Sequence, residues 1–183
     1  LGLLEKYPQR TKNDEVLYQL AKTYELKGEA EKHLTTLTRL VTEYPETRYL
    51  AEVQFRRGEI LFAWSEYALA QEAFDAVSKT KNETFLSNAY YMLGWSMFKQ
   101  NDYDDALLMF SKVLDRIFSQ HSDVIISDLT HVEAHQATLV NDLLRVMGLS
   151  FSYLDGAQSL AVLFDRIGAR HYEVMIYAHY SRL

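Results

Sequence analysis

The sequence contains no cysteine, which excludes disulfide bonds, thiol catalysis and zinc sites with cysteine ligands. Only two prolines and seven glycines occur in 183 residues, a composition that suits helices better than a turn-rich β fold. The uninterrupted apolar runs are only a few residues long, so none is able to span a bilayer. Basic residues are also scarce: 19 Lys and Arg against 25 Asp and Glu give a net charge of −6, which argues against a nucleic-acid partner.

Apolar residues are plentiful. They make up 48% of the chain, and aromatic residues make up 13%, so the sequence is not that of a disordered protein. A chain of this length buries a substantial core. There is no glycine-rich phosphate loop, and the serines inside helical runs have no histidine nearby in sequence, so we expect no catalytic residues.

An internal repeat organises the chain. Four residues recur 36 positions later in the same order: Gly58, Tyr67, Ala70 and Phe74 are matched by Gly94, Tyr103, Ala106 and Phe110. A weaker copy lies 37 residues before the first window, at Ala21, Ala30, His33 and Leu37, and another lies 54 residues after Gly94, at Gly148, Ala157 and Phe164. Self-similarity at such a period predicts an array of helical repeats.

Each copy is expected to form two antiparallel helices joined by a tight turn. The turns are predicted at residues 27–28, 64–65, 101–102 and 155–156, and the helix pairs near 14–44, 51–79, 87–118 and 141–167. Glycine inside a helix costs roughly 1 kcal/mol relative to alanine, so close packing must offset that loss. We therefore expect Phe74 and Phe110 to be almost completely buried against the small residues of their own repeats.

These residues resemble the tetratricopeptide repeat family, whose period is about 34 residues. The resemblance is carried by Gly58, Tyr67, Ala70 and Phe74, by Leu93, Gly94, Tyr103, Ala106 and Phe110, and by Leu20, Tyr24, Gly28 and Pro45. It implies an all-α fold, an αα-hairpin superhelix of the tetratricopeptide type. His33 and Leu160 stand where the family prefers alanine, so local helix spacing is expected to differ there.

The longer period, with Tyr44–Pro45 closing a second helix, resembles the bacterial cell-envelope branch of the family. That resemblance implies a periplasmic or cell-envelope location, with the cytoplasm as the alternative. We expect residues 1–183 to form one array cut from a longer one. Residues 3–8 are interpreted as the tail of a second helix, and residues 172–183 as a first helix without its partner, so self-association through open ends is possible.

An irregular insertion is predicted at residues 119–138, where the periodicity lapses. It holds His121, His131 and His135, with Asp123, Asp128 and Glu133 nearby. A spacing of four places His131 and His135 on one helix face, which is compatible with metal ligation, but the pattern is not the H-E-x-x-H of metalloproteases. A solvated loop is the favoured interpretation, and we expect no metal and no cofactor.

The first helices also carry a face that the pairing does not use. By resemblance to the family, it lines the concave surface of the superhelix. The residues predicted to bind a partner there are Tyr18, Glu52, Phe55, Glu59, Phe62, Tyr91, Trp95 and Phe98. The two glutamates favour a ligand with Lys or Arg beside its apolar anchors. The alternative is that neighbouring helices cover this face.

The leading hypothesis for function is a non-catalytic scaffold that binds a peptide or a protein surface in this groove, in a bacterial cell-envelope assembly. The alternative is a structural spacer or self-association module of a longer repeat protein. A third hypothesis, an enzyme or metal-dependent module using the insertion histidines, has little support in the sequence.

Overall fold

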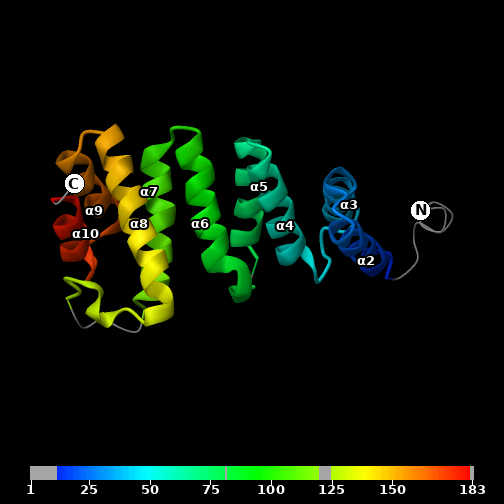
Figure 1. Cartoon of the computed structure of the whole chain (residues 1–183), viewed down its shortest axis with the longest axis horizontal. Coiled ribbons are helices and arrows are strands. Elements are labelled where there is room, and N and C mark those ends of the chain that lie inside the picture. Colours follow the sequence, from blue (N-terminus) through cyan, green and yellow to red (C-terminus); the bar gives the residue numbers. More distant parts are fainter. Residues whose placement is uncertain (1–11, 81, 120–124, 182–183) are drawn as a thin grey trace. The chain divides into compact units, whose positions relative to one another are not determined.

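The computed structural model describes residues 12–80, 82–119 and 125–181, and these residues contain helices and no strand (Figure 1). The α-helices are α2 (Asn13–Leu26), α3 (Ala30–Glu43), α4 (Leu50–Ala63), α5 (Tyr67–Ser78), α6 (Glu83–Lys99), α7 (Tyr103–Ile117), α8 (Ala134–Tyr153), α9 (Ala157–Ile167) and α10 (Glu173–Tyr180). A short 3-10 helix, η1, spans Leu129–His131. The chain divides into two compact units with the boundary after Ala89, inside α6.

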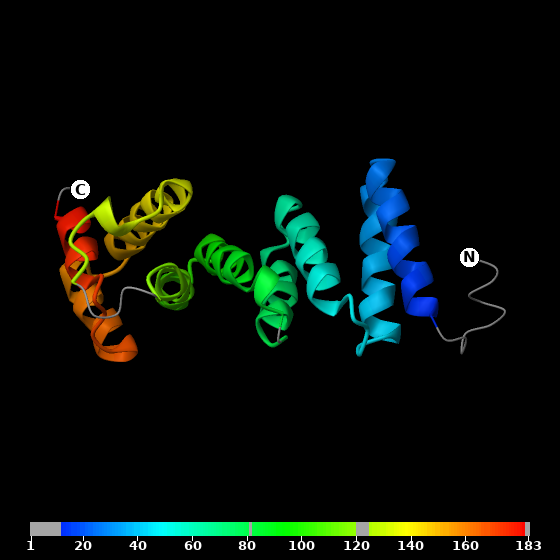
Figure 2. The same cartoon turned by 90° about the horizontal axis from the view of Figure 1, so that it is seen from below.

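Unit 1 contains two helix hairpins, α2 with α3 and α4 with α5, and the first residues of α6. Figure 2 shows α2 and α3 side by side along their length. The two hairpin turns reverse the chain through a residue with left-handed backbone, Gly28 (φ +68°) and Ser65 (φ +65°). These are the predicted turn positions, and the positive φ lets the second helix begin within a few residues.

The centre of the α4–α5 hairpin is a glycine–phenylalanine contact. A Cβ atom added at Gly58 would lie 2.6 Å from Cε1 of Phe74, closer than two carbon atoms can approach. Phe74 is 0% exposed. Glycine is therefore required because the ring of Phe74 occupies the space of a side chain at position 58, and the predicted burial of Phe74 is confirmed.

Unit 2 begins with the rest of α6 and contains α7 to α10. The same contact recurs between α6 and α7, where a Cβ atom at Gly94 would lie 2.6 Å from Cε1 of Phe110. Phe110 is 0% exposed, as predicted. Asn101 (φ +65°) and Gly156 (φ +61°) again mark the two predicted turns. An all-α fold of αα-hairpins is thus confirmed.

Two helix starts differ from the prediction. Helix α6 begins at Glu83 rather than near 87, after Asn82, whose side-chain oxygen accepts a hydrogen bond from the Thr84 N–H at 3.0 Å. Helix α8 begins at Ala134 rather than near 141. Its first turn is largely exposed and carries no apolar stripe, so periodicity does not reveal it.

The insertion is consequently shorter than predicted. It ends at Glu133, and residues 120–124 lie outside the described residues, as does the predicted helix end at residues 3–8. Ile126 within the insertion is 0% exposed. Its N–H donates to the carbonyl oxygen of His171 at 2.7 Å, which ties this part of the insertion to the start of α10.

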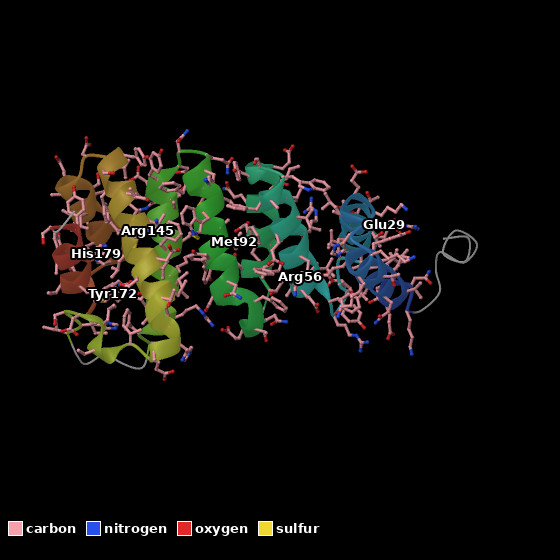
Figure 3. The ribbon with its side chains drawn as sticks, viewed as in Figure 1. Glu29, Arg56, Met92, Arg145, Tyr172 and His179 are labelled. Carbon is pink, nitrogen blue, oxygen red and sulfur yellow. The ribbon has the colours of Figure 1, made fainter. Side chains whose placement is uncertain are left out.

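A partly buried polar network joins α7 to the segment before α10 (Figure 3 labels Tyr172). The Tyr172 hydroxyl donates to Oδ1 of Asp115 at 2.7 Å, and Nε of Arg170 donates to the same oxygen at 2.8 Å. Tyr172 is 0% exposed. Its pKa is raised, mainly by burial and secondly by the hydrogen bond to Asp115. The hydroxyl therefore stays protonated and keeps α10 against α7.

Replacing Tyr172 with phenylalanine is expected to lower the free energy of unfolding by about 1–3 kcal/mol, because the charged, half-buried Asp115 carboxylate loses the hydrogen bond from a buried donor. Tyr177→Phe is the matched control, since Tyr177 lies on α10, which Tyr172 directly precedes, is 40% exposed and makes no hydrogen bond to a described residue through its hydroxyl. Urea unfolding of both variants measures the difference. Equal stability of the two variants would show that the network contributes nothing.

Candidate functional site

Helices α2 and α4 form one face of unit 1, and its side chains are linked to one another. The Tyr18 hydroxyl donates to Oε2 of Glu52 at 2.9 Å, and Nζ of Lys22 lies 3.9 Å from Oε1 of the same glutamate. The Tyr18 ring stacks on Tyr49, with centroids 3.9 Å apart. These contacts leave Tyr18 only 9% exposed.

A cavity of about 260 Å³ opens beside this face, at the turn between α2 and α3. It is lined by Glu25, Gly28, Ala30, His33, Arg56, Glu59 and Ile60. Figure 3 labels Arg56 on α4. Its guanidinium pairs with Glu59 at 2.9 Å, whereas Glu25 forms no ion pair with any described residue.

His33 is the buried residue of this cavity, with only 6% of its surface exposed. Within the described part of the chain its ring makes no hydrogen bond. Burial lowers the pKa of His33 below its ordinary value of 6.5; the charge of Glu25 opposes this shift and the charge of Arg56 adds to it. The ring is therefore neutral at pH 7.

The lowered pKa of His33 predicts a loss of stability in mild acid. Below about pH 6.5 the unfolded chain binds a proton at this histidine more readily than the folded chain, so the free energy of unfolding falls as pH falls. Urea unfolding at about pH 7 and pH 5.5 should show a smaller acid loss for His33→Leu than for the unmodified chain. His135→Gln, which changes a histidine with a 71% exposed side chain, is measured alongside as the control.

Helices α6 and α8 form a more apolar face in unit 2. Trp95 and Phe98 are half-buried, with ring centroids 5.4 Å apart. The ring centroids of Phe98 and Tyr153 lie 6.1 Å apart, and Tyr153 stacks on Tyr103 with centroids 4.9 Å apart. Tyr153 is 61% exposed and Leu149, one helical turn before it, is 41% exposed. These five residues, Trp95, Phe98, Tyr103, Leu149 and Tyr153, are called the aromatic face below.

Polar residues border the aromatic face. The Tyr91 hydroxyl donates to Oδ2 of Asp142, and the other carboxylate oxygen accepts from Arg145 at 2.9 Å. The pKa of Tyr91 is raised to about 12, mainly by burial and secondly by the hydrogen bond to Asp142. Burial alone would raise the pKa of Asp142, but the hydrogen bonds from Tyr91 and Arg145 lower it. Asp142 is therefore charged and holds Tyr91 against α8.

The eight residues predicted to bind a partner are distributed over both units. Tyr18 is 9% exposed and Phe55 is 7% exposed, so neither offers much surface to a ligand. Phe55 packs edge-on against Phe74, with ring centroids 5.6 Å apart. The other six are half-buried: Glu52, Glu59, Phe62, Tyr91, Trp95 and Phe98. Their role in binding stays a prediction.

Sequence reasoning missed the most exposed ring of the aromatic face and the cavity at His33. Tyr153 is the last residue of α8. Its ring meets Phe98 because α8 and α6 come together there, and the spacing of residues along one helix does not reveal that contact. His33 did give a signal, since it replaces the small residue expected at that position of the repeat.

The described residues include no group of three or more His, Asp or Glu side chains able to hold a metal ion. In the insertion, Nδ1 of His135 lies 3.2 Å from Oε2 of Glu133, with both side chains exposed. His121 and Asp123 lie outside the described residues, as does the side chain of His131. No described helix combines the length and hydrophobicity that crossing a membrane requires.

Comparison with known proteins identifies the type of repeat in two stretches of the chain. The sequence profile described as tetratricopeptide repeat matches residues 15–47 and 88–116, which cover the α2–α3 hairpin and most of the α6–α7 hairpin. The chain contains tetratricopeptide repeats. No curated protein matches the sequence.

Solved structures of a protein called MamA share the fold of this tetratricopeptide repeat chain. One is described as MamA 41-end from Desulfovibrio magneticus RS-1, with 16% identity, a TM-score of 0.56, and coverage of 88% of this chain and 77% of that one. Another, the MamA RS-1 ArsTM double mutant, has 16% identity and a TM-score of 0.58, covering 88% and 76%. At this identity the likeness concerns the fold alone.

Proposed function

We propose that this tetratricopeptide repeat chain is a non-catalytic scaffold that binds an apolar segment of a protein partner on the aromatic face of unit 2. One observation carries the proposal. Tyr153 and Leu149 are 61% and 41% exposed beside the half-buried rings of Trp95 and Phe98. Exposed apolar surface that is contiguous and bordered by polar groups is typical of protein interaction sites.

Tyr153, the most exposed residue of the aromatic face, lies outside the contact that pairs α6 with α7. The pairing of α6 with α7 is completed beneath it by Gly94 and Phe110, and the ring of Tyr153 only covers the edge of Phe98 and Tyr103. Aromatic side chains bring large apolar area with few rotatable bonds, which is why they dominate interface energies. A short amphipathic segment with two apolar anchors fits such a face.

Affinity capture with quantitative mass spectrometry tests the proposal in extracts of cells that produce the protein. Tyr153→Asp places a charge in the middle of the aromatic face, and partner recovery is expected to fall at least about tenfold. Val162→Asp is the matched control, because Val162 is 51% exposed on α9 of the same unit and lies outside the aromatic face. Equal recovery with both variants would contradict the proposal.

A second candidate function is self-association, which the exposed apolar residues on α9 and α10 favour: Val162 (51%), Val174 (48%) and Tyr177 (40%). Sedimentation equilibrium distinguishes the two candidates. Self-association through this surface requires a dimer or larger assembly that Val162→Asp dissociates and Tyr153→Asp does not. If the chain acts only as a scaffold for a partner, neither substitution needs to change its assembly state.

A cell-envelope location of this protein and its partner is part of the same proposal. Its support is the resemblance to envelope repeat proteins, carried by the long period and by Tyr44–Pro45 at the end of α3. Fractionation of cells that produce the full-length protein tests it. The proposal expects the protein with the envelope fraction, and recovery with the soluble cytoplasmic fraction would contradict it.

A further inference from the structure

The cavity at His33 in unit 1 combines two features that are unusual together. His33 is 94% buried, since only 6% of its surface is exposed, and its ring has no hydrogen-bond partner among the described residues. Its nitrogen atoms are not completely enclosed, and the residue lines the cavity. A neutral imidazole offers one hydrogen-bond acceptor, and no described group donates to that of His33.

The charged groups around this space leave a negative excess. Among the residues that line it, the charged ones are Glu25 on α2 and Arg56 and Glu59 on α4. Arg56 pairs with Glu59, while Glu25 makes no ion pair with any described residue. Two carboxylates against one cation, with His33 neutral, amount to one negative charge at the rim of the cavity.

We propose that this cavity binds the ammonium group of a lysine side chain from a partner protein, held by the Glu25 carboxylate and the acceptor nitrogen of His33. An ammonium group donates three hydrogen bonds and accepts none, which matches an unpaired carboxylate and an unpaired acceptor. The cavity of about 260 Å³ has room for the four-carbon chain of lysine. The proposal does not depend on the aromatic face, which belongs to unit 2.

Other ligands fit less well. A carboxylate would face the negative charge of Glu25, which makes no ion pair with a described residue, and Arg56 is already paired with Glu59. A metal ion would need three converging ligands, and the described residues offer no such group. The guanidinium of arginine is planar and lacks the compact charge that one carboxylate and one imidazole nitrogen complement.

The test uses n-butylammonium chloride, which reproduces the lysine side chain, with the whole chain and with sodium chloride holding the ionic strength constant. The ring proton signals of His33 are assigned by their absence in His33→Leu and followed by NMR about one pH unit above the ordinary histidine pKa. We expect a saturable shift of these signals with a dissociation constant of about 1–20 mM. Equimolar n-butanol and sodium butyrate should give no saturable shift.

Two further variants locate the charge that is responsible. Glu25→Gln keeps the shape of the side chain and should weaken binding of n-butylammonium at least about threefold. Glu72→Gln, an exposed substitution on α5 of the same unit, should leave the dissociation constant unchanged. The proposal is overturned by an absent shift up to about 100 mM, by equal shifts with n-butanol, or by equal affinity of the two variants.

Discussion

Replacing Phe110 with alanine is expected to lower the free energy of unfolding by about 3–5 kcal/mol, the range for a large aromatic residue removed from a rigid core. Phe110 is 0% exposed and its ring fills the space above Gly94. Trp95 also contacts this ring, with centroids 6.1 Å apart. Because the neighbouring helix has no side chain at position 94, that position offers no atoms to refill the cavity.

Urea unfolding followed by Trp95 fluorescence measures this loss, in a Trp64→Phe background so that the signal reports on unit 2 alone. Phe98→Ala is the matched control. Phe98 lies on the facing helix and is half-buried, so we expect a loss of about 1–2 kcal/mol. A loss below about 1 kcal/mol for Phe110→Ala would contradict the repeat register.

A double-mutant cycle sharpens the same prediction. Gly94→Ala alone should destabilise the chain, because its Cβ atom would lie 2.6 Å from the Phe110 ring. In combination with Phe110→Ala the added methyl group enters vacated space, so the loss for the double variant should be smaller than the sum of the single losses. Additive losses would mean that the two residues do not contact each other.

Tyr153→Ala is expected to weaken binding of the protein partner at least about tenfold, because exposed aromatic residues at the centre of an interface contribute most of its energy. The same substitution should change the free energy of unfolding by less than about 1 kcal/mol. Tyr153 is 61% exposed and makes only ring contacts, with Phe98 and Tyr103. Titration calorimetry with the captured partner measures the first quantity, and urea unfolding the second.

Trp95→Ala should also weaken binding but is a less clean test. Its ring contacts Tyr91 and Phe98 in addition to Phe110, with the Tyr91 centroid 6.3 Å away, so part of its effect falls on stability. The two substitutions together distinguish surface from core. If Trp95→Ala weakens binding and Tyr153→Ala does not, the partner does not contact the aromatic face.

Contacts within one hairpin and the positions of its turns could be predicted from the sequence, because both depend on residues close together in the chain. Gly58 with Phe74 and Gly94 with Phe110 lie at a fixed separation, and that separation reports the contact between two helices of one hairpin. The turns at Gly28 and Gly156 follow from the conformational freedom of glycine. Ser65 and Asn101 take the same left-handed conformation without that signal, and only the repeat places turns there.

Contacts between residues far apart in the chain could not be predicted in this way. Tyr172 meets Asp115 across 57 positions, and Tyr91 meets Asp142 across 51. Burial of Phe55 likewise depends on Phe85, which comes from a different helix pair. The candidate site was therefore predicted only in part: the sequence indicated which helices carry it, but not which of their rings neighbouring helices cover.

Site-specific photo-crosslinking in cells that produce the protein tests the central claim, that the aromatic face contacts a protein partner. A benzophenone amino acid replaces Tyr153 in one variant and Val162 in the other, two exposed positions of unit 2. The account predicts a crosslinked product of defined mass at position 153 that is weak or absent at position 162. Equal crosslinking at both positions, or crosslinking at 162 alone, would contradict it.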